Sequence, residues 1–237
     1  NVSSFDHLRF SIRLGLGVMV SGQPNFGHDV GGFVGDAQAE LLTRWIEADA
    51  LMPFFRNHTL NGTADQEPWV FGDPWTLWNR RAIEFRYRMM PYLYSLFHAC
   101  STSGVPASLP AAFVFPADTN TWSRNENDYF AGSHLLVAPV VASGATTRAV
   151  YLPAGSDWFA WSDDERLNGG QTITRAASLG TLPMYIRAGA IVPMGPVHRY
   201  AGEPRPAWVE IHVWPGTNRF ELFEDDGETT NHEAGVF

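Results

Sequence analysis

The alternation of helical and strand-like segments over the first hundred residues constrains the fold more than any other feature. Residues 3–16 place apolar side chains at helical spacing behind a candidate serine N-cap, and residues 18–22 indicate a short buried strand. A second helical pattern at 37–50 leads into a second apolar run at 51–55, and a loop follows each run. This order is typical of a parallel sheet or a (β/α)8 barrel, in which the loops after the strands carry the chemistry.

The rest of the chain changes character after one long helical pattern. Residues 76–100 repeat apolar side chains at steps of three and four, and Pro91 is expected to kink or divide that helix. From residue 105 the content of Pro, Gly, Ser and Thr rises and the apolar runs shorten, which indicates an antiparallel β-domain. The predicted strands lie in 111–115, 134–141, 148–153, 158–161 and 183–193.

A second β-module is expected near the end of the chain. Residues 197–205 resemble a linker, and the stretches 208–215 and 219–227 alternate apolar and polar side chains. The EDDG sequence that ends the second stretch indicates a turn with solvated acidic groups. We therefore predict three parts: the C-terminal part of a barrel over 1–104, a proximal β-domain over 105–197 and the start of a distal β-domain over 198–237.

Charge and residue usage exclude several classes of function. The net charge is −9, and all sixteen basic residues are scattered arginines, so no nucleic-acid partner is predicted. No run approaches 18 apolar residues, so we predict no membrane-spanning helix and no membrane partner. The single Cys100 excludes an internal disulfide. The eight histidines form no metal-ligand spacing and the glycine-rich stretch is no nucleotide motif, so we predict neither a metal nor a cofactor.

Two unusual stretches, FGHDVGGF at 26–33 and FFRNH at 54–58, fall on loops that follow the predicted strands. Together with the next loop they supply one candidate set of side chains: Asp29, Phe33, Arg56, His58, Glu67 and Trp69. A carboxylate accepts hydrogen bonds from hydroxyl groups, an imidazole donates one, and aromatic rings stack on flat ligands. The set therefore suits the recognition of a sugar.

Each member of this set also has a structural alternative. Asp29 is equally suited to cap the glycine-rich turn, and His58 to be a loop histidine with satisfied hydrogen bonds. Arg56 and Glu67 are favoured as a structural ion pair, because arginine is preferred for buried pairing with carboxylates. Trp69 and Phe33 are more often packing residues. The residue types alone leave the ligand and structural roles open.

An ordered series of motifs covers nearly the whole chain: FGHDVGGFVG, ELLTRWIEADALMPFFRNHT, EPWVFGD, FRYRMMPYLYSLF, HLLVAPVV, VYLPAG, WFAW and LPMYIRAGAIVP. This series resembles the C-terminal half of a glycoside hydrolase family 31 enzyme. The resemblance implies a (β/α)8 barrel that acts on α-linked sugars with retention, followed by antiparallel β-domains. The expected fold class is thus α/β plus all-β.

The resemblance also assigns roles to individual positions. Asp29, Phe33 and His58 match residues that bind the sugar at the cleavage point, with Arg56, Glu67 and Trp69 in support. Retaining hydrolysis needs two carboxyl groups about 5 Å apart. The family's nucleophile lies in a W-x-D-M-N-E-type segment and its acid/base in a W-x-G-D-N segment. Neither segment occurs here, and Asn1 matches the asparagine of the second. Both catalytic carboxyl groups are therefore expected upstream of Asn1.

The expected function is part of a retaining, exo-acting α-glycoside hydrolase, first of all an α-glucosidase. Its expected partners are an α-linked oligosaccharide or glucoside and the N-terminal remainder of the same enzyme, without which the fragment should be inactive. An α-xylosidase or an α-glucosyltransferase is the alternative within the family. A non-catalytic carbohydrate-binding or structural subunit is the alternative outside it.

Overall fold

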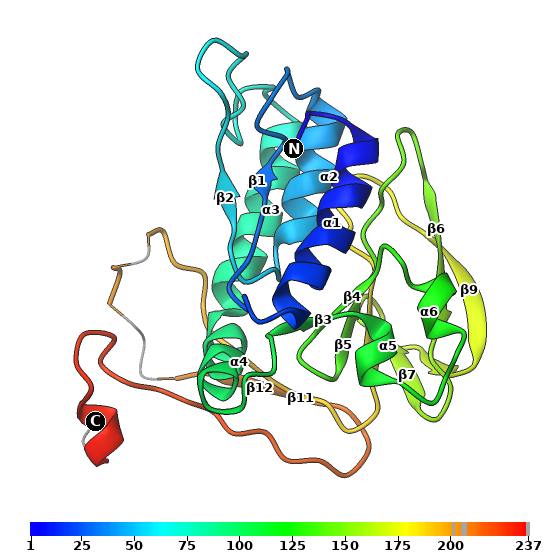
Figure 1. The fold of residues 1–237 in the computed structure, drawn as a ribbon, viewed down its shortest axis with the longest axis vertical. Helices are drawn as coiled ribbons and strands as arrows, with labels where there is room; N and C mark the ends of the chain where they lie inside the picture. The colour runs from blue at the N-terminus through cyan, green and yellow to red at the C-terminus, as the bar shows by residue number, and fades with distance from the viewer. Residues whose placement is uncertain (201, 205–207, 236–237) are drawn as a thin grey trace.

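The computed structural model describes residues 1–200, 202–204 and 208–235 (Figure 1). The first part contains α1 (Phe5–Val20), β1 (Asp29–Val30), α2 (Ala39–Asp49), β2 (Arg56–Asn57), α3 (Trp75–Arg88) and α4 (Met90–Ser103). The second part contains β3 (Ser108–Leu109), α5 (Ala111–Val114), α6 (Thr121–Arg124), β4 (Tyr129–Ala131), β5 (Leu135–Val137), β6 (Thr147–Leu152), β7 (Asp157–Ala160), β8 (Arg166–Asn168), β9 (Gln171–Ala176), β10 (Met184–Arg187), β11 (Ile191–Met194), β12 (Glu210–Val213) and a 3-10 helix at Asn231–Ala234.

Helix α1 is capped as predicted but runs further than the sequence indicated. The Ser4 side chain accepts a hydrogen bond from the backbone N–H of His7, which satisfies one free donor of the first turn. The buried stripe continues past Gly15 to Met19, so the predicted strand at 18–22 is wrong. Gly15 permits a close contact, because a Cβ there would lie 2.7 Å from Nε2 of His28. Gly15 therefore allows α1 to pack closely against His28, and it does not end the helix.

Strands β1 and β2 form a parallel pair. Asp29 lies opposite Arg56, and Val30 lies opposite Asn57. The predicted strand at 51–55 is wrong, because the chain continues from α2 in a turn in which the N–H of Met52 bonds to the carbonyl of Asp49. Short apolar runs do not distinguish a strand from a buried turn by periodicity. Pairing starts only at Arg56.

The long helical pattern at 76–100 forms two helices, α3 and α4, which meet at Met89 just ahead of Pro91. A proline is tolerated in the first turn of a helix, where its missing N–H has no partner to lose. Helix α4 ends at Gly104, whose φ of 75° is the left-handed conformation typical of a glycine C-cap.

The second part is built from antiparallel sheets. A six-stranded sheet has the order β3-β4-β5-β10-β7-β8, and β6 pairs with β9. The predicted strand at 111–115 is instead helix α5, in which the N–H of Phe115 bonds to the carbonyl of Ala111. Strand β12, within the predicted 208–215 stretch, pairs with β11. The predicted strand at 219–227 is not formed, and Asp226 instead accepts from the backbone amides of Glu228 and Thr229 in a turn.

The hydrophobic core is continuous between the helices and the sheets. One buried cluster includes Leu42 and Trp45 of α2 together with Tyr129, Leu135 and Ile186 of the six-stranded sheet. A second buried cluster lies on the sheet's other side, against β6. The fold is therefore mixed α/β with antiparallel sheets, and the domain boundaries at 104 and 197 stay predictions. In the described part of the chain, no helix has the length and apolarity to span a membrane.

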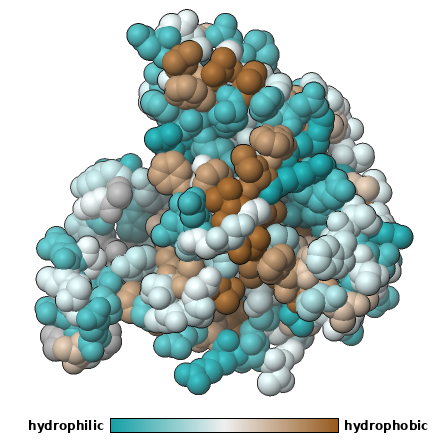
Figure 2. Space-filling view, in the orientation of Figure 1, coloured by the Kyte–Doolittle hydropathy of each residue, from teal (hydrophilic) through white to brown (hydrophobic). Residues whose placement is uncertain are grey.

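Hydrophobic residues also gather on the outside, in a band down the middle of the face that carries α1 and β1 (Figure 2). Phe10 and Leu14 of α1 are 55% and 45% exposed, and Phe54 beside β2 is 42% exposed. A hollow of about 400 Å³ beside the two parallel strands is lined by apolar side chains that include Val30, Ile83 and Tyr87. The parallel pair is thus incompletely covered beside this hollow.

Candidate functional site

Asp29 and Arg56 lie opposite each other at the start of the two parallel strands. Both Nε and Nη2 of Arg56 donate to one carboxylate oxygen of Asp29, Oδ1, at 2.9 and 2.5 Å. The other oxygen, Oδ2, accepts no hydrogen bond from the described residues. The predicted pairing of Arg56 with Glu67 is therefore wrong, because the parallel register places Asp29 directly opposite the arginine. The result is a fixed carboxylate with one oxygen available to a ligand.

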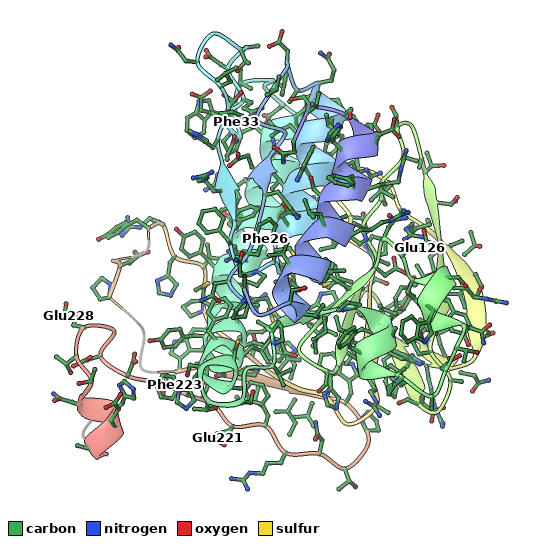
Figure 3. All side chains as sticks on the ribbon, viewed as in Figure 1. Phe26, Phe33, Glu126, Glu221, Phe223 and Glu228 are labelled. Carbon is green, nitrogen blue, oxygen red and sulfur yellow. The ribbon has the colours of Figure 1, made fainter. Side chains whose placement is uncertain are left out.

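Phe33 and His58 lie side by side on the loops that follow β1 and β2. Their ring centroids are 5.4 Å apart and the ring planes are inclined by 31°. The N–H of Leu60 donates to the carbonyl of Phe33 at 2.8 Å, which joins the two loops directly. Phe33 lies at the end of the molecule where the N-terminus also lies (Figure 3). The two predicted stretches thus meet at one end of the parallel pair.

Asn1 bridges both ends of the glycine-rich stretch. Its Nδ2 donates to the carbonyl of Asp29, and its Oδ1 accepts from the N–H of Phe33, each at 3.0 Å. Gly32 has a φ of 96°, and a Cβ there would lie 2.5 Å from the backbone nitrogen of Ser3. A side chain at this position is excluded both by the backbone conformation and by the close approach of the neighbouring segment.

Gln66 is a residue of the site that the sequence did not reveal. Its side chain is buried, and Nε2 donates to the carbonyls of Val30, Gly32 and His58 at 3.3, 3.3 and 3.2 Å. One amide group therefore ties the loop that bears Asp29 to the loop that bears His58. Its partners are up to 36 residues away in the sequence, so no local pattern could have indicated this role.

A buried pair lies beneath the same stretch. Nδ1 of His28 is 3.1 Å from Oδ2 of Asp49, which also accepts from the indole N–H of Trp45 at 3.1 Å. Burial by itself would lower the pKa of His28, but the charge and the hydrogen bond of Asp49 outweigh it, so the pKa is raised. This pair anchors the strand that presents Asp29 to helix α2.

Glu67 and Trp69 are not brought into this cluster. Both are exposed, and Trp69 is 66% exposed. Within the described part of the chain, no hydrogen bond, ion pair or ring contact joins either side chain to Asp29, Phe33 or His58. The described residues also contain no group of three or more potential metal ligands.

The clustered groups are suited to binding hydroxyl groups. The free oxygen of Asp29 can accept, the imidazole of His58 can donate, and the ring of Phe33 offers an apolar surface. The arginine holds the carboxylate in one orientation, so little conformational freedom would be lost on binding.

Comparisons with known proteins point to one family. A model described as the TIM-barrel domain of glycosyl hydrolases family 31 matches residues 1–96, and a model described as the C-terminal domain of glycosyl hydrolase family 31 matches residues 104–192. Alpha-glucosidase 2 of Bacillus thermoamyloliquefaciens is 35% identical over 240 residues, which cover 100% of this chain and 30% of that protein.

Solved structures agree with the family models. A family 31 dextranase of Flavobacterium johnsoniae, in complex with isomaltotriose, matches with a TM-score of 0.92 and 33% identity over 100% of this chain and 30% of its own. An alpha-xylosidase of the same family from Xanthomonas citri matches with a TM-score of 0.91 and 34% identity over 99% of this chain and 27% of its own. The chain thus spans about 30% of the length of the proteins that it matches.

Proposed function

Because the chain belongs to glycoside hydrolase family 31, we propose that it is the C-terminal part of a retaining, exo-acting α-glucosidase. Residues 1–104 would complete a (β/α)8 barrel, and residues 105–197 and 198–237 would form its proximal and distal β-domains. The uncovered apolar surface beside β1 and β2 supports this reading, because a parallel barrel strand is normally covered on both faces. The remaining strands and helices of the barrel would be its cover.

Asp29, Phe33 and His58 bind the sugar at the cleavage point in this proposal, and Arg56 orients Asp29. The observation that carries it is the carboxylate whose Oδ1 is held by Arg56 and whose Oδ2 accepts nothing from the described residues. Two charge-assisted bonds fix the carboxylate plane, so Oδ2 is directed before the sugar arrives. The chain supplies recognition, and both catalytic carboxyl groups come from the preceding part of the enzyme.

The substrate is an α-linked glucoside or oligosaccharide. The dextranase structure that matches this chain was solved with isomaltotriose, and the similar protein from Bacillus thermoamyloliquefaciens is an alpha-glucosidase. An α-xylosidase is the second candidate, because an enzyme of that name matches equally well in structure. Comparing kcat/KM for p-nitrophenyl α-glucoside and α-xyloside in the complete polypeptide decides between the two. The fragment by itself should hydrolyse neither.

The variant Asp29→Asn in the complete polypeptide tests the binding role. Loss of a charge-assisted hydrogen bond to a hydroxyl costs about 1.5–3 kcal/mol, so kcat/KM should fall roughly 10- to 150-fold while the melting temperature changes little. Asp36→Asn is the matched control, because Asp36 is exposed on the same loop and, among the residues that the structure describes, accepts only from the backbone N–H of Ala64. Native kinetics in the Asp29→Asn variant would contradict the binding role and would leave Asp29 with only a structural role in the glycine-rich loop.

A further inference from the structure

A second cleft lies between helix α3 and the antiparallel sheets. Its volume is about 410 Å³, within the range of roughly 300–1,000 Å³ that is usual for small-molecule sites. Helix α3 contributes Trp78, Arg81 and Phe85, which recur at helical spacing on one face. The loop that follows β7 contributes Trp161 and Asp163 from the opposite wall.

This cleft is separate from the cluster around Asp29, because Asp29, Phe33 and His58 are not among its lining residues. The hollow beside the parallel strands is lined by Ile83 and Tyr87 of α3, which lie on the other face of the helix from Trp78 and Phe85. Strands that fill the first hollow would therefore pack on the face of α3 that carries Ile83 and Tyr87, away from Trp78 and Phe85. The cleft belongs to the junction between the helices and the β part.

The aromatic walls of the cleft are held in place. Trp161 lies edge-to-face with Phe85 at a centroid distance of 5.7 Å and is also packed on Trp214 at 5.7 Å. Trp78 packs closely on Gly180, which lies in the loop between β9 and β10 and has a φ of 82°. A side chain at this position would clash with the indole ring. Trp161 is only half-buried, so part of this preformed aromatic surface faces the cleft.

Hydrogen-bonding groups with unused capacity lie beside these rings. Arg81 is exposed and makes no hydrogen bond or ion pair with the described residues. Asp163 accepts through Oδ1 from the backbone N–H of Glu165, which leaves Oδ2 available. The hydroxyl of Ser162 likewise makes no bond within the described part of the chain. The cleft therefore offers both donors and acceptors.

The charges of the cleft cancel. Glu47 is engaged by Arg44 and by the backbone of Gly180, and Arg175 is paired with Glu165. This leaves Arg81 and Asp163, which have opposite signs. A strongly charged ligand would meet a like charge on one wall, whereas a neutral ligand with hydroxyl groups and apolar faces finds partners for both.

We propose that this cleft is a second carbohydrate site, which binds a short neutral oligosaccharide away from the candidate site around Asp29. The fixed indole of Trp161 stacks on the apolar face of a pyranose, while Arg81 donates to its hydroxyl groups and Asp163 accepts from them. That the oligosaccharide is an α-glucan rests on the proposed function. The presence of a neutral sugar site rests on the cleft itself.

The test measures binding of maltotriose and isomaltotriose to the complete polypeptide by saturation-transfer NMR and calorimetry. All variants carry Asp29→Asn to weaken the first pocket. We expect residual binding of at least one trisaccharide, with its affinity lowered about 5- to 20-fold by Arg81→Ala and by Asp163→Asn. Arg80→Ala is the matched control, because this neighbour pairs with Glu84 on the outer face of α3 and should leave affinity unchanged.

Two results would overturn the proposal: no residual binding in the Asp29→Asn background, or residual binding that is indifferent to both cleft variants. Circular dichroism of each variant checks that the fold is retained. Hydrolysis of p-nitrophenyl α-glucoside separates this proposal from the first one. Arg81→Ala alone should leave kcat/KM for this small substrate unchanged, whereas Asp29→Asn alone should lower it. Native kinetics in the Asp29 variant would therefore count against the first pocket and not against the cleft.

Discussion

At the scale of single residues, the candidate pocket depends on a few side chains that hold loops rather than contact a ligand. Arg56 directs one oxygen of Asp29, and Asn1 bridges the ends of the stretch between Asp29 and Phe33. Gln66 joins that stretch to the loop that carries His58. The position of each candidate ligand-binding group is thus determined by polar contacts that are distant in sequence.

The variant Gln66→Leu tests whether these polar contacts hold the loops. Gln66 is the most buried of the three side chains that make them. Leucine removes the shared donor of three backbone carbonyls, of which those of Val30 and Gly32 are in buried hydrogen bonds, and each unmet buried group costs on the order of 1–3 kcal/mol. We expect urea unfolding of the complete polypeptide to show a loss of about 2–4 kcal/mol, together with a higher KM for the glucoside. Gln38→Leu is the control, because the exposed Gln38 makes no capping bond to α2. Equal stability of the two variants would contradict the role of Gln66.

His58→Ala should weaken the binding of a monosaccharide inhibitor to the complete polypeptide by about 1–3 kcal/mol, the cost of leaving a polar partner unpaired. The ring contact with Phe33 would be lost at the same time. The shape of the pH profile of kcat/KM should be preserved, because the proton-transfer groups are proposed to be carboxyl groups outside this chain. Loss of one limb of that profile would make His58 a proton-transfer group, and an unchanged inhibition constant would remove it from the pocket.

At the scale of elements, helix α2 is joined to the β part by hydrogen bonds of a buried ion pair on the helix, Arg44 and Glu47. Arg44 is almost fully buried and donates to the carbonyls of Ala145, Ala177 and Ser178 at 3.1, 2.8 and 3.2 Å. Its partner Glu47, 3.1 Å away, also accepts from the N–H of Gly180. Because so many backbone groups depend on Arg44, removing it should cost far more than a surface ion pair would.

The pH dependence of stability should report on Glu47. Burial raises the pKa of Glu47 to about 7, although Arg44 acts in the opposite direction. A raised pKa in the folded state means that stability is fully present below the unfolded value of about 4.5 and is lost as pH rises through 7. Between pH 4.5 and 8 the native protein should therefore lose on the order of 3 kcal/mol relative to Glu47→Gln.

Urea unfolding of both proteins across this pH range measures the difference. Glu84→Gln serves as the control, since Glu84 pairs with Arg80 on the outer side of α3 and should add no comparable slope. A Glu47→Gln variant with the same pH dependence as the native protein would show that the carboxyl group stays ionised throughout.

At the scale of the whole molecule, the two parts of the chain differ in how completely they are paired. The six-stranded sheet buries residues on both faces, whereas the parallel sheet in the described residues consists of β1 and β2 alone beside an open hollow. An unpaired strand edge with uncovered apolar side chains is poorly protected from water. The parallel pair should thus be less stable than the six-stranded sheet when residues 1–237 are expressed alone.

Hydrogen exchange tests this difference in stability. In the isolated chain, amides of β1 and β2 should exchange far faster than those of β5 and β10, and in the complete polypeptide they should become protected. The amides of β5 and β10 are the internal control, because both strands lie inside the six-stranded sheet. Uniform protection and one cooperative thermal transition in the isolated chain would show that the parallel pair needs no further strands.

Local patterns in the sequence determined the position of most elements. The stripe of α1 and the division of α3 from α4 before Pro91 follow from periodicity and from proline chemistry, and the predicted strand runs overlap β5, β6, β7, β10, β11 and β12. Strands β3, β4, β8 and β9 were not predicted. The motif series also determined the family. These features depend on neighbouring residues or on the order of motifs, so they can be predicted without knowledge of distant contacts.

Only the tertiary structure decided where short apolar runs lie and which polar groups meet. Residues 18–20 stay helical because Met19 continues a buried stripe, and residues 111–114 form a helix although their apolar run favoured a strand. Arg56 pairs with Asp29 because two strands align in parallel, and Gln66 reaches three carbonyls across two loops. Burial and pairing depend on residues that are tens of positions away in the sequence. A local sequence pattern does not indicate which of these residues will be in contact in the folded protein.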